Sequence, residues 1–156
     1  MNRLTRGLLA GAVAGAAGTT ALNAIAYGDM AVRGRPPSTT PEQSVERLAE
    51  RLRLRVPGSA ARRPHRTSGL GALLGMATGA GMGALAGAAR AAGVRLPLPA
   101  GAAVTTGLAM LAANGPMTAL GVTDPRSWTA TDWASDVLPH VGYGVVTSAA
   151  LRLMLP

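Results

Sequence analysis

The chain has 156 residues, of which 48% are hydrophobic and 14% are charged, whereas roughly 25% of residues are charged in an average soluble domain. All 15 basic residues are arginine, the formal net charge is +8, and the lack of cysteine excludes disulfides and thiolate metal sites. Nine of the arginines fall between Arg33 and Arg66 and the apolar stretches are almost uncharged. This distribution indicates a membrane protein with one basic loop, and not a nucleic-acid-binding protein.

Four stretches lack charge over about the length that a bilayer requires, ~20 residues per helix. They run over about 7–27, 69–89, 98–120 and 134–153, and the last of them contains His140 and ends near Arg152. Helix is expected in each, because lipid offers no partner to an unpaired backbone group. The sequence therefore predicts an all-α fold, a four-helix transmembrane bundle that makes up a single membrane domain over 1–156.

Two alternatives stay open. The four segments are only mildly apolar, so a soluble helical bundle rich in Gly and Ala is the first. The second concerns residues 1–26, where Arg3 and Arg6, an apolar run and Ala24-Ile25-Ala26 resemble a secretory signal peptide with its small-residue cleavage site. Against the second alternative, the apolar run is long for such a peptide and three further apolar stretches follow.

A polar, basic loop is predicted over 28–68, between the first two spans. It opens with Arg33-Gly-Arg-Pro-Pro, which is incompatible with regular helix. Thr40 then suits a helix N-cap, with Pro41 at the first helical position and Gln43 three residues after the cap. This predicts a short amphipathic helix that runs to about Leu54.

The predicted loop helix carries an apolar stripe of Val45, Leu48 and Leu52, with charged residues around it. Such a helix either lies on the bilayer surface or covers the end of the bundle as a solvated helix. Arginines near an anionic leaflet are worth ~1 kcal/mol each, so the loop is expected to contact anionic lipid or a partner. The residues expected to make this contact are Arg47, Arg51, Arg55, Arg62 and Arg63.

The arginines also predict an orientation. If the 28–68 loop faces the cytoplasm, so does the loop around Arg126, and ten arginines lie inside against five outside. Both termini are then expected outside the cytoplasm. Arg3 and Arg6 argue the opposite, because they directly flank the first span.

Glycines recur at four-residue spacing in the first two spans. Spacing by four keeps them on one slowly drifting helical stripe, where a second helix can approach closely. The partner helix is expected either in the same chain or in a second copy of it, which makes a homo-oligomer an open possibility. The residues expected to pack helices are Gly7, Gly11 and Gly15 in the first span, and Gly71, Gly75, Gly79, Gly83 and Gly87 in the second.

Ionisable residues at membrane depth are the default functional candidates. Thr129 with Asp132 three residues later predicts a helix start. Asp132, Asp136 and His140 then follow at four-residue spacing and share one helix face. Asn23 and Asn114 could join this polar face from other spans.

Three interpretations of the polar face compete. In the structural one, the carboxylates pair with arginines such as Arg66, Arg90 or Arg126, and His140 hydrogen-bonds a neighbouring helix. In the second, the face is a proton or cation path. In the third, it is a metal site, which needs ligands from other helices, because three residues at this spacing on one helix span about 12 Å.

The last third of the chain contains the stretch 116–125, followed by Trp133-Ala-Ser-Asp-Val-Leu-Pro-His. These residues resemble the C-terminal part of the YagU-like inner-membrane proteins, and Asp132, Asp136 and His140 match the acid, acid and His pattern of that family. Here both acids are Asp instead of Glu, and Pro139 is added. Through Gly18-Thr-Thr-Ala-Leu-Asn and the following basic segment, the chain is also similar to uncharacterised actinobacterial small polytopic membrane proteins. The resemblance implies a bacterial inner-membrane location and no known reaction.

No enzyme motif is present: there is no nucleophile elbow, no phosphate loop, and no histidine pair placed for zinc hydrolysis. We therefore expect a non-enzymatic integral membrane protein that needs no cofactor, contacts the lipid bilayer and does not bind nucleic acid. A small channel or proton/cation-conducting protein is the alternative function. A membrane metal-binding protein or metalloenzyme is the third.

Overall fold

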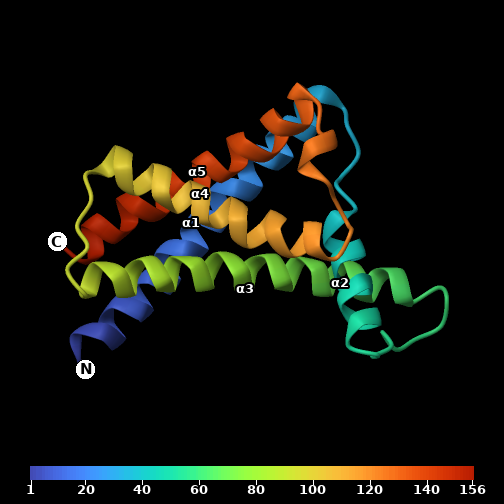
Figure 1. Cartoon of the computed structure of the whole chain (residues 1–156), viewed down its shortest axis with the longest axis horizontal. Helices are drawn as coiled ribbons and strands as arrows, with labels where there is room; N and C mark the ends of the chain where they lie inside the picture. The colour runs from blue at the N-terminus through green and yellow to red at the C-terminus, as the bar shows by residue number, and fades with distance from the viewer.

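The computed structural model describes residues 1–156 and is all-α, as predicted, with five α-helices and no strands (Figure 1). Each of the four apolar stretches lies within or along one long helix, and the basic loop contains the predicted short helix. A single 3-10 turn, Pro125–Ser127, precedes the last helix. The helices are α1 (Arg3–Arg33), α2 (Thr40–Arg51), α3 (Arg63–Ala91), α4 (Leu98–Ala119) and α5 (Ala130–Met154).

Several helix boundaries extend beyond the uncharged stretches, for local reasons. α1 continues past residue 27 to Arg33, which pairs with Asp29 one turn earlier, and it ends at Gly34 in the left-handed conformation, with φ 62°. α3 starts at Arg63, six residues before the predicted 69, with a proline in its first turn. The predicted start of α5 is confirmed: the Thr129 and Asp132 side chains form a capping box.

The predicted ends of the short loop helix were off by a few residues. α2 ends at Arg51 and not at about Leu54, and its N-cap is Thr39, one residue before the predicted Thr40. α4 passes through Pro116 to Ala119 without a break.

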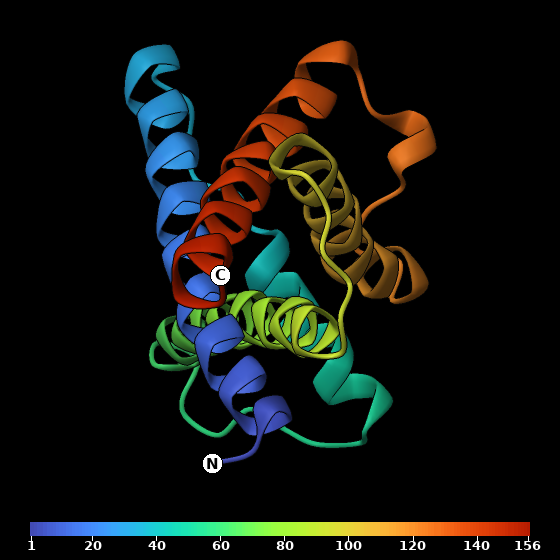
Figure 2. The same cartoon turned by 90° about the vertical axis from the view of Figure 1, so that its left-hand side faces the viewer.

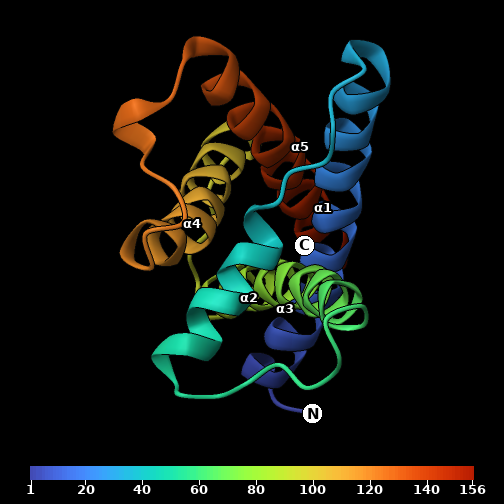
Figure 3. The same ribbon diagram turned by 90° about the vertical axis from the view of Figure 1, so that its right-hand side faces the viewer.

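The four long helices run back and forth between two ends of the molecule (Figure 1). α1 and α4 lead away from the end that carries both chain termini, and α3 and α5 return to it. α1 packs against α3 and α5, and α5 packs against α4. Figure 2, viewed from the termini end, shows that α1 and α5 cross α3 at an open angle. Figure 3 shows α2 lying across α3 at the opposite end, here called the α2 end.

The crossing of α1 and α3 is built on glycine. Gly7, Gly11 and Gly15 of α1 lie against the last third of α3, around Gly83 and Gly87. A Cβ added at Gly11 would lie 2.8 Å from the Cα of Ala84, and a Cβ at Gly87 would lie 2.7 Å from the Cα of Gly11. Only residues without side chains allow the two backbones to approach this closely.

The remaining glycines of α3 have different neighbours. Gly79 faces Thr19 of α1 and Tyr143 of α5, and Gly71 faces Pro41 of α2. Gly75, in the middle of the predicted series, has no neighbouring atom within 4 Å of the place that a Cβ would take. The glycine series of α3 therefore contacts α2 at its start, through Gly71, and α1 at its end, through Gly83 and Gly87. Gly75, between them, contacts no other helix.

The interior of the molecule is small. Only 21 of the 156 residues are buried, and Tyr143 is the largest side chain among the fully buried ones. Large apolar side chains are exposed along all four long helices, Leu73 of α3 and Leu111 of α4 among them. Two helices, α1 and α3, are long and apolar enough to cross a membrane. Just 28% of the apolar stretch of α1 and 11% of that of α3 are buried within the molecule, so neither is the enclosed core helix of a globular domain.

Candidate functional site

Asp136 and His140 of α5 and Asn114 of α4 form one hydrogen-bonded group near the α2 end. The Asn114 side-chain amide donates to Asp136 Oδ2 at 2.8 Å. His140 Nδ1 lies 2.7 Å from the backbone carbonyl oxygen of Asp136 and 3.6 Å from its Oδ1. The His140 ring is nearly buried, with its side chain 11% exposed. α4 and α5 are thus joined by an amide and a carboxylate, and the carboxylate lies beside a buried imidazole.

The local chain explains why these groups meet. Residues four apart share a helix face, so Asp136 and His140 are neighbours on α5. Pro139 has no backbone N–H, and the helix continues through it. Thr106 of α4 donates its hydroxyl to the backbone carbonyl of His140 at 3.3 Å, a second polar link between α4 and α5.

The structure separates the other two predicted members from this group. Asp132 takes part in the capping box at the start of α5. Its Oδ2 accepts from the Thr129 backbone N–H at 2.9 Å and from the Thr129 hydroxyl at 2.6 Å. Asn23 of α1 is half-buried and makes no hydrogen bond with Asp136 or His140. The predicted five-residue face is therefore reduced to Asn114, Asp136 and His140.

The expected arginine partners of the carboxylates are also bound elsewhere. Arg66 donates to the carbonyl oxygen of Pro57 at 2.7 Å, and Arg90 donates to that of Leu155 at 2.5 Å. Arg126 pairs with Asp124 at 3.0 Å, inside its own loop. The prediction that one of these arginines neutralises Asp136 was wrong. The 120–129 connection holds Arg126 against Asp124 of the same loop, and Arg66 and Arg90 donate to backbone carbonyls in other parts of the molecule.

The chemistry open to the Asn114, Asp136 and His140 group is limited. No cluster of three or more His, Asp or Glu side chains is close enough together to hold a metal ion. Asp136 and His140 line neither the pocket beside α2 nor the groove between α3, α4 and α5. The group can hold α4 and α5 in register through the hydrogen bond between the Asn114 amide and the Asp136 carboxylate.

A polar link that the sequence argument missed joins the end of α1 to α5. Arg33 donates to both carboxylate oxygens of Asp29 at 2.6 Å, and its Nη2 donates to the hydroxyl of Ser135 at 2.6 Å. Arg35 donates to Asp29 Oδ2 at 2.6 Å. The four-residue spacing of Asp29 and Arg33 was a visible signal for the pair. The contact with Ser135 had no signal, because it depends on how α1 and α5 pack.

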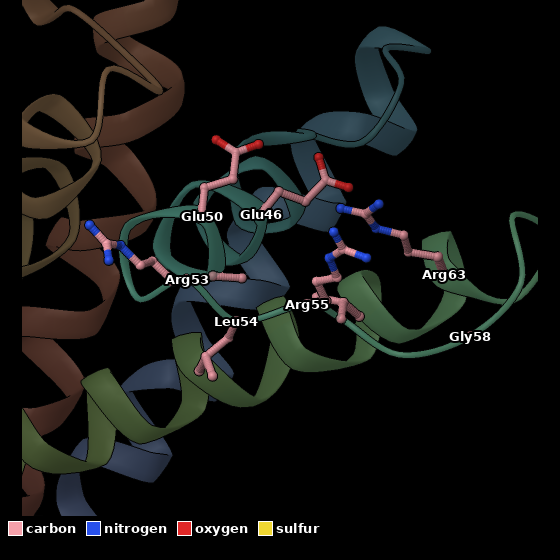
Figure 4. Close-up of a pocket in the computed structure, with 9 residues that line it drawn as sticks. Glu46, Glu50, Arg53, Leu54, Arg55, Gly58 and Arg63 are labelled. Carbon is pink, nitrogen blue, oxygen red and sulfur yellow. The ribbon is translucent and has the colours of Figure 1, made fainter.

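The basic segment surrounds a shallow pocket of about 470 Å³ at the C-terminal end of α2 (Figure 4). Arg53, Arg55 and Arg63 line it together with Glu46 and Glu50. Figure 4 shows Arg55 and Arg63 on the same side as Glu46, while Arg53 points away from them. Acidic and basic side chains both line this pocket, so it does not present a purely cationic surface.

The other predicted contact residues of the basic segment lie on its surface. Arg47 pairs with Glu50 at 3.3 Å, and both side chains are more than half exposed. Arg51 and Arg62 are exposed. Leu48 and Leu52 are exposed as well, so part of the predicted apolar stripe of α2 faces outward instead of packing on α3.

Comparison with protein-family models, with curated protein sequences and with solved structures gave no match in any of the three. The similarity of the last third to the YagU-like proteins stays a prediction from Asp132, Asp136 and His140. What the chain establishes is a helical protein with two helices long and apolar enough to cross a membrane.

Proposed function

We propose that the chain is a non-enzymatic, multi-pass protein of the bacterial inner membrane, in which α1, α3, α4 and α5 all cross the bilayer. The observation that carries this proposal is the outward-facing apolar surface of the four long helices. Soluble monomers rarely expose contiguous apolar patches larger than a few hundred Å². Here large apolar side chains are exposed on every long helix, and the interior holds little besides Ala, Gly and a few hydroxyl-bearing residues.

The way the helices contact one another supports the same proposal. In lipid, burial of apolar surface does not drive helices together, so membrane helices associate through small residues and interhelical hydrogen bonds. The α1–α3 contact is made by glycine, and the α5 side chain of Tyr143 donates its hydroxyl to the Gly79 carbonyl of α3 at 2.7 Å. Thr105 and Ser148 link α4 to α5 at 3.3 Å. A soluble helical bundle would instead bury leucine and isoleucine at these contacts.

The position of α1 favours a retained helix over a cleaved signal peptide. Ala14 of α1 is fully buried, and Gly11 and Gly15 are in contact with α3. Removal of residues 1–26 would expose Gly79 and Gly83 of α3 and the Tyr143 ring. The retained α1 completes the surroundings of the only large aromatic side chain in the interior.

Within this proposal, the Asn114, Asp136 and His140 group stabilises the pairing of α4 with α5, and the basic segment contacts anionic headgroups. Buried polar groups in a membrane are costly unless they are hydrogen-bonded to one another, and these are. The alternative, ion conduction through the same group, predicts proton or cation flux in liposomes that Asp136→Asn abolishes. The structural role predicts flux equal to that of empty liposomes and a lower unfolding midpoint for the variant.

The membrane proposal is tested by cysteine accessibility, because the chain has no cysteine of its own. Single cysteines replace Ala92 in the α3–α4 connection, Ser59 in the basic segment and the exposed Met76 in the middle of α3. With both termini outside, a membrane-impermeant maleimide labels Ala92→Cys in intact spheroplasts. It labels Ser59→Cys only after lysis, and it does not label Met76→Cys in native membranes.

Alkaline carbonate extraction of the unmodified protein is the companion measurement. An integral protein stays in the pellet, and release into the supernatant would rule the proposal out. Labelling of Met76→Cys in intact membranes at the rate of the two loop positions would also rule it out. Labelling of Ser59→Cys in spheroplasts, with Ala92→Cys protected until lysis, would keep the spans and reverse the orientation.

A further inference from the structure

A second groove lies at the termini end, where α3, α4 and α5 meet. It has a volume of about 270 Å³ and is lined mainly by apolar side chains, Leu85 of α3, Leu98 and Leu108 of α4 and Leu151 of α5 among them. Ligand pockets in proteins run from roughly 300 to 1,000 Å³, so this groove is sized for a narrow ligand. The two hydroxyls in its wall, Thr105 and Ser148, are paired with each other at 3.3 Å. Apart from two arginines at one end, the groove therefore offers an apolar ligand a wall without unpaired polar groups.

One end of the groove is strongly cationic. Arg90 and Arg152 line it directly, and Arg95 lies close enough to act electrostatically on Arg90. None of the three forms an ion pair. All seven acidic side chains lie toward the α2 end, in the last two turns of α1, in α2, in the 120–129 connection and in the first two turns of α5: Asp29, Glu42, Glu46, Glu50, Asp124, Asp132 and Asp136. No acidic side chain pairs with the three arginines beside the groove.

The length of the groove matches one leaflet of a bilayer. Its wall on α4 extends from Leu98 to Leu108, ten residues apart, which is about 15 Å at the rise of an α-helix. Half of a ~30 Å hydrocarbon core is the same length. The arginines stand at the outer end, where headgroups lie, and Leu108 stands toward the middle of the membrane.

We propose that this groove binds one acyl chain of an anionic phospholipid, with the lipid phosphate paired to Arg90 and Arg152. The proposal rests on the membrane function argued above and goes beyond it by naming a defined lipid site at the end opposite the basic segment. Charge complementarity selects an anionic lipid, and the apolar wall selects its chain. At the α2 end, by contrast, Arg33, Arg35, Arg47 and Arg126 already have carboxylate partners.

The test uses the full chain, purified in detergent and delipidated. Phosphatidylglycerol and phosphatidylcholine with identical acyl chains are added separately, and native mass spectrometry measures the fraction of protein that retains one lipid. The unmodified protein is expected to retain phosphatidylglycerol in preference. Arg90→Gln with Arg152→Gln should weaken phosphatidylglycerol binding about thirtyfold, because each arginine adds ~1 kcal/mol of attraction to an anionic lipid.

The matched control removes two exposed arginines near the same end that do not line the groove, Arg3→Gln with Arg6→Gln, and should change retention less than about twofold. Gly101→Leu tests the groove itself at unchanged charge. A Cβ at Gly101 lies in ordinary contact, 3.5 Å from Ser148 Oγ, so Gly101→Ala is tolerated and serves as its control, while leucine fills the groove. If Gly101→Leu does not fold, Val104→Trp at the exposed rim replaces it.

The proposal is overturned by equal retention of the two lipids, by full binding in the Arg90 and Arg152 double variant, or by full binding in a folded groove-filling variant. The last result would mean that arginines bind lipid at the surface without the groove. Failure of the membrane function is separate, since it appears as release of the protein by alkaline carbonate. An integral protein without lipid preference would sink the groove site alone.

Discussion

The contact between α1 and α3 predicts that adding a single methyl group to Gly83 will destabilise the protein. A Cβ at Gly83 would lie 2.5 Å from the Cα of Gly15 and 2.6 Å from its nitrogen. Two carbon atoms pack at roughly 3.5 Å or more, so the helices must separate by about 1 Å. The atoms in the way are backbone, which cannot rotate aside. Overpacking of this kind costs about 1–3 kcal/mol.

Gly75→Ala is the matched control on the same helix. Alanine is favoured over glycine inside a helix by about 1 kcal/mol, and this gain is common to both variants. Gly75 has open space where the methyl group would go. The difference in unfolding free energy between the two variants therefore isolates the clash, and we expect about 1–3 kcal/mol in disfavour of Gly83→Ala.

The assay is thermal or denaturant unfolding in detergent, followed by far-UV circular dichroism. For a chain of this length, each kcal/mol moves the thermal midpoint by about 2–4 °C, so the two variants should differ by several degrees. If Gly83→Ala unfolds at or above the midpoint of Gly75→Ala, the close approach of α1 and α3 at this position is refuted. A parallel result for Gly11→Ala would extend the conclusion along the contact.

Four other predictions concern single residues. Tyr143→Phe removes the hydrogen bond to the Gly79 carbonyl, 2.7 Å long, and should lower the unfolding free energy by about 0.5–1.5 kcal/mol in the same assay; no change would show that water or Thr147 replaces it. Asn114→Ala leaves the Asp136 carboxylate without its amide donor, so the unfolding free energy should fall by about 1.5–3 kcal/mol. Thr78→Ala on α3 is the control and should change the unfolding free energy little. Arg53 adopts a left-handed backbone with φ 55°, and Arg53→Gly should raise the stability by up to about 1 kcal/mol, because glycine has no Cβ to strain; a lower midpoint would contradict this. Hydrogen bonds from the Thr129 side chain and backbone hold the pKa of Asp132, which precedes the predicted 134–153 span, below its usual 3.8, so this cap stabilises the fold above about pH 4 and its contribution is lost as the pH falls below that value; the gap in midpoint between the unmodified protein and Thr129→Ala should shrink on acidification, and a constant gap would refute the assignment.

The presence of each helix could be predicted from the sequence, because each has a local cause. Uncharged length marked the four long helices, and Pro41 marked the start of α2 to within one residue. The Thr129 and Asp132 spacing marked the start of α5. The extensions of α1 and α3 were missed, because charged residues such as Asp29 and Arg63 were read as loop. The bounds of an uncharged stretch mark the part of the chain that can lie within lipid. The helix itself can extend further, through charged residues, until a residue such as Gly34 ends it.

Partners in space were harder to predict than helices. The glycine spacing predicted a packing stripe, yet nothing in it distinguishes Gly75, which has no neighbour, from Gly83, which touches backbone. The Asp136 and His140 pair follows from spacing on one helix. Its link to Asn114 requires that α4 and α5 pack in one particular register, and that register depends on Gly144 and Thr106 as well as on the length of the 120–129 connection.

The unequal lengths of the helices have a consequence for the thickness of the surrounding membrane. α1 has 31 residues and α3 has 29, or about 45 Å of helix each, whereas α4 has 22, about 33 Å at the same rise per residue. Helices longer than the hydrocarbon core tilt or protrude, and a tilted pair crossing at glycine fits in the same slab as the shorter α4. In the proposed membrane protein, α4 sets the preferred bilayer thickness, and the angle at which α1 and α3 cross accommodates their greater length. Thinner bilayers should therefore widen that crossing before they expose α4.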